Sequence, residues 1–185
     1  MNLRRFACFL FAAASSAHAA HYDVLLRGGR VLDGSGTPWF YADVALNGDR
    51  IAAVGKLPDA TATLVVDARG LYVAPGFIDG HTHAGPALAR SAALAAAAPI
   101  LTQGITTVFV NHDGGGPVDL AAQRRALAAH PLGVNVAQLI GHNSVRTEVL
   151  NLADREPDDA ELARMATLVR RGMEAGAFGL SAGPF

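Results

Sequence analysis

Apolar and polar positions along the chain follow two patterns, which change near residue 74. Up to residue 73, short apolar runs alternate with polar and glycine-rich turns, a pattern typical of strands. Asn47-Gly48 separates the apolar runs 42–46 and 50–54, and this dipeptide is the strongest short hairpin signal. The other strands that we expect in this part are 23–27, 31–32, 64–67 and 71–73. The pattern predicts a small β-sandwich subdomain over residues 20–73.

After residue 74, apolar strand-like runs alternate with helical patterns, which favours parallel βα units. The expected strands are 76–80, 106–110, 134–140 and 177–181. The expected helical segments are a weak helix or covering loop over 87–98, a short turn from Pro99 to Gly104, a helix over 117–129 and a helix that begins near Asp158. Asp158-x-x-Glu161 is a capping box, and Gly176 is a natural end for that last helix. Its apolar stripe, which we expect to pack in a core, is Leu162, Met165, Leu168, Val169 and Met173.

The first 19 residues have the pattern of a secretory signal peptide rather than of a folded segment. Arg4 and Arg5 precede a short apolar core, and Ala17-His18-Ala19 is a small-x-small cleavage site. The alternatives are a mitochondrial presequence or a frayed N-terminus. We expect an exported protein, periplasmic or secreted, with no membrane span after the leader is removed, because no later apolar run is long enough.

Net charge and cysteine content indicate which kinds of partner and which covalent cross-links to expect. Removing the leader takes away two arginines and no acid, which leaves 13 basic and 16 acidic residues and a net charge of about −3. That balance gives no electrostatic reason to expect a nucleic acid as partner. Cys8 is the only cysteine and lies in the leader, so we expect no disulfide in the mature chain.

Polar side chains follow three of the expected strands at their carboxyl ends, where barrel active sites lie. The first end carries His81-x-His83, and residues i and i+2 of a strand share one face, so the two imidazoles could form half of a zinc site. Two unconnected surface histidines are the alternative. The second end is Asn111-His112-Asp113-Gly114, and the third is Gly141-His142-Asn143-Ser144.

Two further residues are candidates for substrate binding. His142 could be a ligand, a residue behind the ligands or a substrate contact. Arg146 has a guanidinium that matches the geometry of a substrate carboxylate, although a solvated loop arginine is an equal alternative.

Several segments together resemble one protein family. APGFIDGHTH follows DVLLRGGRVLDGSG, and GITTVFVNHDGGGP, GVNVAQLIGHNSVR and MEAGAFGLSAG come after it in that order. The chain from residue 22 to residue 185 therefore resembles the amidohydrolase superfamily, and more narrowly its N-acyl-D-amino-acid deacylase group.

The resemblance implies an α/β fold: the first half of a metal-dependent hydrolase (β/α)8 barrel over residues 74–185, with strands 1–4, preceded by the β-sandwich subdomain. A whole barrel takes about 250 residues, so we expect an N-terminal fragment. The resemblance also implies that His81, His83 and Asp113 bind one or two divalent ions, most simply zinc. Asp113 stands where the group often has a cysteine, which loosens the preference for zinc; His112 is the rival ligand, and a helix cap is the alternative role of Asp113.

The implied reaction is metal-assisted hydrolysis of an amide, releasing a carboxylate and a D-amino acid from a small N-acyl amino acid. The family places the general-base aspartate on its last strand, so we expect it beyond residue 185 and assign no catalytic residue here. One alternative is a cyclic amidohydrolase of the dihydroorotase or hydantoinase kind, but that group uses a carboxylated lysine, and the only lysine, Lys56, lies in the β subdomain. The other alternative is an inactive partial barrel.

Overall fold

The computed structural model describes residues 20–183. The predicted leader, residues 1–19, and the terminal Phe185 lie outside the described residues. Contacts between residues divide the chain into two compact units, Met1–Pro75 and Gly76–Phe185. Within the described residues, no helix has the length and apolar character that crossing a membrane requires.

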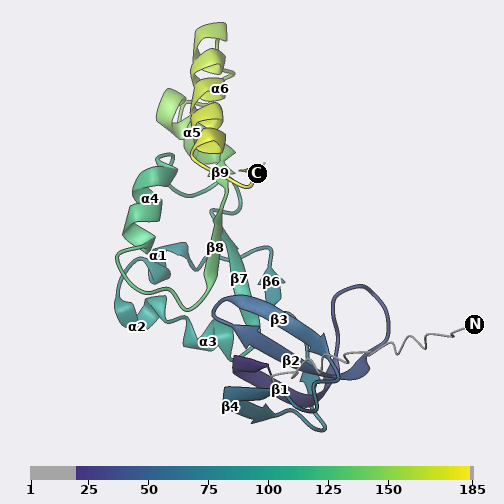
Figure 1. The fold of residues 1–185 in the computed structure, drawn as a ribbon. Coiled ribbons are helices and arrows are strands. Elements are labelled where there is room, and N and C mark those ends of the chain that lie inside the picture. Colours follow the sequence, from purple (N-terminus) through teal and green to yellow (C-terminus); the bar gives the residue numbers. More distant parts are fainter. Residues whose placement is uncertain (1–19, 184–185) are drawn as a thin grey trace, which may run out of the picture. The chain divides into compact units, whose positions relative to one another are not determined.

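The first unit is a single five-stranded sheet (Figure 1). Its strands are β1 (His21–Val31), β2 (Phe40–Asn47), β3 (Arg50–Gly55), β4 (Thr61–Asp67) and β5 (Tyr72–Val73). They run in the order β3-β2-β1-β4, and β5 also pairs with β1. The hairpin predicted at Asn47-Gly48 is confirmed, because β2 and β3 pair antiparallel across it. Residues 20–75 form one layer only, and the second layer of a sandwich stays a prediction.

Strand β1 corrects the sequence analysis, which predicted two separate strands on either side of Gly28-Gly29. A register shift against β2 between Leu26 and Gly29 lets the strand continue through this point. Gly28 has a φ of 73°, a conformation that glycine adopts without steric cost. The two glycines therefore form a bulge inside one long strand instead of a turn.

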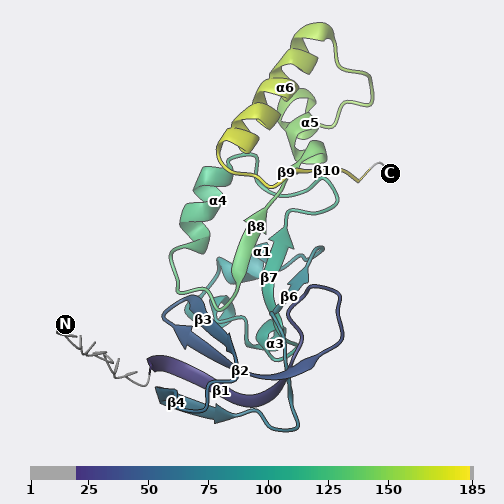
Figure 2. The same ribbon diagram turned by 45° about the vertical axis from the view of Figure 1, so that its right-hand side comes forward.

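The second unit contains parallel strands joined by helices (Figures 1 and 2). Its strands are β6 (Phe77–Asp79), β7 (Ile105–Val110), β8 (Asn135–Gln138), β9 (Ile140–Gly141) and β10 (Leu180–Ser181). β6, β7 and β8 form one parallel sheet in that order, and β10 pairs parallel with β9. A strand lies at each of the four predicted places, and the parallel pairing is confirmed. The first and fourth strands are shorter than predicted, β7 begins one residue earlier, and the predicted strand 134–140 is divided into β8 and β9.

Helices α1 (Gly85–Leu88), α2 (Ala92–Ala95) and α3 (Ala98–Leu101) follow β6 as short turns. α1 and α2 stand where a weak helix or covering loop was predicted over 87–98, and α3 stands at the short turn predicted from Pro99. α4 (Leu120–Leu127) is shorter than predicted, because the side chain of Asp119 accepts the backbone N–H of Ala122 and caps the helix there. Val108 and Val110 of β7 are fully buried in the core beneath α1 and α4.

The last two helices are α5 (His142–Leu150) and α6 (Asp159–Glu174). α6 begins with the predicted capping box between Asp158 and Glu161. Two members of its predicted core stripe are wrong, because Leu162 and Met173 are 54% and 45% exposed. Met165 is buried, and Leu168 and Val169 pack against the same core.

Candidate metal centre

The two histidines of the His81-x-His83 motif are held by contacts of the residues around them. Asp79, at the end of β6, accepts the backbone N–H of His81 with its Oδ1 at 3.0 Å. Thr82 donates both its backbone N–H, at 3.2 Å, and its hydroxyl, at 2.7 Å, to the carbonyl of Phe109 on β7. Thr82 is thereby fixed to the neighbouring strand, and the rings of His81 and His83 lie 5.5 Å apart.

Asp113 follows β7 and meets both histidines. Its Oδ2 lies 3.4 Å from Nε2 of His81 and 3.3 Å from Nε2 of His83. The side chains of His81, His83 and Asp113 are 59%, 71% and 44% exposed, so their ligand atoms are accessible. Among residues 20–183, this is the one group of three or more His, Cys, Asp or Glu residues whose ligand atoms are close enough for a shared metal ion. All three atoms lie within 4.8 Å of one another.

The turn that carries Asp113 has an unusual backbone. Asn111, Asp113 and Gly114 have φ values of 72°, 56° and 74°, in the left-handed region. For residues with a side chain this conformation costs on the order of 1 kcal/mol each, and surrounding contacts must hold it. The Asn111 amide exchanges two hydrogen bonds of 2.8 Å with the Gln123 amide and donates a third to the Leu139 carbonyl. Asp113 does not cap α4, since Asp119 does.

His112 lies between the two left-handed residues and contacts the site with its ring face. Its ring stacks on that of His81, with centroids 4.2 Å apart and planes 12° from parallel. Its buried Nε2 has no hydrogen-bond partner. His112 contributes no atom to the three-residue group, so in this structure it supports His81 through ring contact rather than as a ligand.

The model of the amidohydrolase family matches residues 64–185, from β4 to the end of the chain. This chain belongs to the amidohydrolase family. Among solved structures, a D-aminoacylase aligns with a TM-score of 0.79 and 34% identity, over 88% of this chain and 38% of that one. An N-acyl-D-glutamate deacylase from Bordetella bronchiseptica, complexed with zinc and a phosphonate inhibitor, aligns with a TM-score of 0.78 and 33% identity.

Curated relatives of this amidohydrolase chain point to the same group of deacylases as the solved structures do. The D-aminoacylase of Alcaligenes xylosoxydans xylosoxydans is 39% identical over 92% of this chain and 40% of its own length. The N-acyl-D-aspartate deacylase of the same organism is 38% identical over 90% of this chain and 37% of its own length. The chain therefore spans about two fifths of the length of these relatives. Its fold is a mixed α/β part of the amidohydrolase fold.

The three side chains fit a zinc ion in kind, and the spacing of Asp113 to each histidine fits one as well. Imidazole nitrogen and carboxylate oxygen are both zinc ligands, at about 2.0–2.2 Å from the ion, so two such atoms in a tetrahedral site lie about 3.4 Å apart. The two distances from Asp113 Oδ2 to the histidines, 3.4 and 3.3 Å, agree with that requirement. A solved D-aminoacylase has a binuclear metal centre with one-metal activation and second-metal attenuation.

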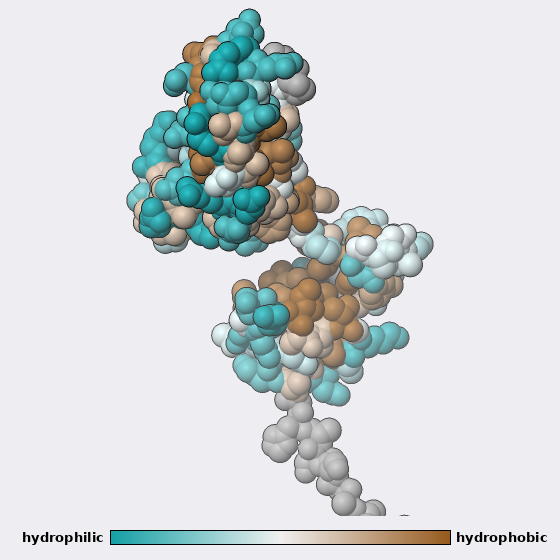
Figure 3. Space-filling model, turned by 90° about the horizontal axis from the view of Figure 1, so that it is seen from above, coloured by the Kyte–Doolittle hydropathy of each residue, from teal (hydrophilic) through white to brown (hydrophobic). Residues whose placement is uncertain are grey.

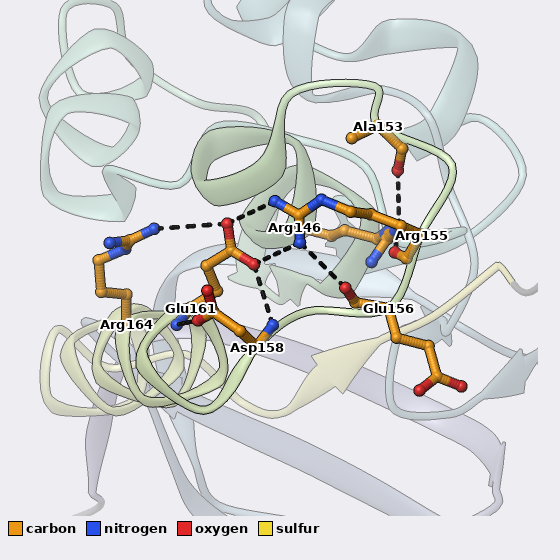
Figure 4. Close-up of polar contacts among 7 residues, drawn as sticks. All are labelled: Arg146, Ala153, Arg155, Glu156, Asp158, Glu161 and Arg164. Atoms are coloured by element: carbon orange, nitrogen blue, oxygen red, sulfur yellow. Dashed lines mark hydrogen bonds and ion pairs between the residues drawn. The ribbon is translucent and has the colours of Figure 1, made fainter.

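The two predicted substrate contacts are not brought into this group. His142 begins α5, and its Nδ1 lies 3.2 Å from Oδ1 of Asn143. Arg146 donates to the carbonyls of Ala153, at 2.9 Å, and Arg155, at 2.7 Å, which fastens the loop between α5 and α6 (Figure 4). Substrate binding by His142 and Arg146 stays a prediction.

Sequence reasoning missed the residues that hold the ligands in place. Thr82 was visible as the middle residue of the motif, but its double contact with Phe109 depends on how β6 pairs with β7. Gln123, through the Asn111 side chain, and Ser181 act on the Asp113 turn from positions that no local spacing connects. Only the pairing of distant strands brings them together.

Proposed function

We propose that this chain supplies the first part of the metal centre of an amide hydrolase that releases a carboxylate and a D-amino acid from N-acyl-D-amino acids. The observation that carries the proposal is the group of His81, His83 and Asp113, with ligand atoms within 4.8 Å. Support for the substrate class comes from relatives at 39%, 38% and 35% identity, a D-aminoacylase, an N-acyl-D-aspartate deacylase and an N-acyl-D-glutamate deacylase.

The position of the group supports a barrel site. His81 and His83 follow the carboxyl end of β6, Asp113 follows the carboxyl end of β7, and these strands are parallel neighbours. We propose that residues 74–185 are the first half of a (β/α)8 barrel, whose active sites lie at this end. The remaining strands and the general base would come from sequence beyond this chain.

In that site His81, His83 and Asp113 would hold one or two divalent ions, zinc in the simplest case. A bound ion of this kind lowers the pKa of water to about 7 and polarises the scissile carbonyl. The residues of this chain hold the ligands in place before substrate arrives. Thr82, between the two histidines, is hydrogen-bonded to Phe109 of β7, and the ring of His112 stacks on that of His81. The carboxylate supplies the one negative charge in a set with two neutral imidazoles.

The test of the activity is hydrolysis by a form extended to the length of its relatives. We expect release of D-amino acid from N-acetyl-D-amino acids in the presence of Zn2+, far slower release from the L-enantiomers, and loss of turnover in His83→Ala. His130→Ala, which removes a histidine outside the group, is the matched control and should leave turnover unchanged. Equal turnover by His83→Ala and the unmodified protein would contradict the proposal.

We further propose that the protein is exported after cleavage between Ala19 and Ala20. The support is the basic, apolar and small-residue pattern of residues 1–19. Mass spectrometry of the soluble protein from its native host should find Ala20 at the N-terminus. Soluble protein that begins with Met1 would contradict export.

A further inference from the structure

Ser181, on the last described strand, contacts both ends of the turn that carries Asp113. Its hydroxyl donates to the carbonyl of Asn111 at 2.6 Å and accepts the backbone N–H of Gly114 at 3.2 Å. Ser181 is 8% exposed, so water does not readily replace either bond. One oxygen atom thus closes a ring around His112 and Asp113.

The turn benefits from such a closure because two of its residues have left-handed backbones. Asn111 and Asp113 both have positive φ; Asn and Asp tolerate this conformation better than other residues with a side chain, but two of them on either side of His112 still need contacts that hold the turn in one conformation. The Asn111 side chain is fixed by Gln123 and Leu139, which holds the beginning of the turn. Ser181 joins the Asn111 carbonyl to the Gly114 N–H, and two further bonds lie inside this closure: Gly115 donates its N–H to the His112 carbonyl at 2.9 Å, and the Asn143 amide donates to the Asp113 carbonyl at 3.3 Å.

Strand β9 lies against the same turn and brings Ser181 to it. Ser181 of β10 is paired in register with Gly141 of β9. A Cβ atom on Gly141 would overlap the carbonyl oxygens of Gly114 and Gly115, so only glycine allows this close approach. The backbone N–H of Ser144 donates to the Gly114 carbonyl at 2.9 Å. The end of the turn is therefore in close contact with both β9, at Gly141, and β10, at Ser181.

We infer that Ser181 is a positioning residue, which holds the Asp113 turn so that the Asp113 carboxylate meets His81 and His83 and completes the metal site. The inference rests on the proposed function, because it requires Asp113 to be a ligand. Serine suits this position because one hydroxyl both donates and accepts. Alanine would lose both contacts, and threonine would keep the hydroxyl. Residues behind metal ligands typically change metal affinity 10–100-fold when they are removed.

The experiment compares Ser181→Ala with Ser181→Thr and a matched serine control in the same unit. Ser91→Ala is the control, because the Ser91 hydroxyl accepts the N–H of Leu94 at the start of α2 and has no contact with the turn. Zn2+ affinity is measured by competition with a chromophoric chelator, and the Co2+ absorption spectrum reports the ligand geometry. Hydrogen exchange of the Gly114 amide is measured in the metal-free chain.

We expect Ser181→Ala to bind Zn2+ about 10–100-fold more weakly and to change the Co2+ spectrum. The Gly114 amide should exchange roughly tenfold faster in this variant, because its acceptor is gone. Ser181→Thr should restore most of the affinity, and Ser91→Ala should bind as the unmodified chain does. An equal loss of Zn2+ affinity in Ser91→Ala and Ser181→Ala would overturn a specific role for Ser181.

The outcomes separate this inference from the proposed function. If the Zn2+ affinity falls in Asp113→Ala but not in Ser181→Ala, the positioning role of Ser181 is overturned. Asp113 then remains assigned as a metal ligand. Unchanged affinity in both variants removes Asp113 from the ligand set, and the positioning role falls with it. Unchanged exchange at Gly114 in Ser181→Ala overturns the inference directly, whatever the metal does.

Discussion

At the scale of single residues, Asp113 is the side chain that meets both histidines, since its Oδ2 lies 3.4 Å from Nε2 of His81 and 3.3 Å from Nε2 of His83. His81 and His83 were predicted to share a face from the alternation of a strand, and Asp113 from the resemblance to a family; the structure places all three together. The supports could not be predicted in the same way. Ser181 stands 67 positions beyond Gly114, and only the fold connects them.

Asp113 and His112 should differ in their effect on metal content. Asp113→Ala removes the anionic oxygen that faces both histidines, and we expect the protein to lose at least one bound Zn2+ per chain. His112→Phe keeps an aromatic ring against His81, and we expect it to keep its metal. Elemental analysis after gel filtration measures both. Loss of metal in the His112 variant alone would assign the ligand role to His112.

At the scale of elements, the start of α6 was predicted and α5 was not. Asp158 and Glu161 are a local signal that needs nothing but their spacing of three, and the capping box is present. α5 begins at His142 after Gly141, without a side-chain cap, and its sequence HNSVRTEVL contains several weak helix formers. The sequence contains no capping residue that would predict the start of α5, so its helical conformation depends on packing. Val145 and Leu150 supply this packing, since both are buried.

Glu161 gives the start of α6 a dependence on acid. Hydrogen bonds from Arg155, at 2.7 Å to each oxygen, and from the Asp158 backbone lower the pKa of Glu161 from 4.5 to about 2 (Figure 4). A carboxyl with a lowered pKa in the folded state stabilises the fold fully above its unfolded pKa, here about 4.5, and this contribution is lost as the pH falls towards about 2.

We therefore expect Glu161→Gln to lower the unfolding temperature at pH 7 and to flatten its dependence on pH between about 4.5 and 2. Glu156→Gln is the control, because Figure 4 shows the Glu156 side chain directed away from this network, and it should behave as the unmodified chain does. Thermal unfolding followed by circular dichroism measures the three proteins. Parallel pH profiles for Glu161→Gln and the unmodified chain would show that the Arg155–Glu161 pair contributes nothing.

At the scale of the whole molecule, large apolar side chains are exposed on both units. Figure 3 shows brown, hydrophobic atoms gathered on the body that carries the grey N-terminal trace, which is the first unit. The exposed apolar residues of its strands β3 and β4 are Ile51, Val54, Leu64, Val65 and Val66. In the second unit Phe178, two residues before β10, and Leu180 of β10 are exposed as well. Exposed apolar surface of this kind favours association.

We expect the purified chain to associate as its concentration rises, and Val65→Thr to reduce this association without lowering the unfolding temperature. Val44→Thr is the matched control: Val44 is buried in the core of the same sheet, so the substitution should lower the unfolding temperature by burying a hydroxyl. Sedimentation velocity and thermal unfolding measure both properties. A chain that stays monomeric at high concentration would contradict this expectation.

The central claim is that His81 and His83 bind a divalent metal, and the most direct measurement is the metal content of a double variant. The unmodified protein, loaded with Zn2+ and freed of excess metal, should retain zinc, and His81→Ala/His83→Ala should retain none. His21→Ala/His130→Ala removes two histidines that lie outside the group and should retain zinc as the unmodified protein does. Equal zinc content in the unmodified protein and in His81→Ala/His83→Ala would contradict the account.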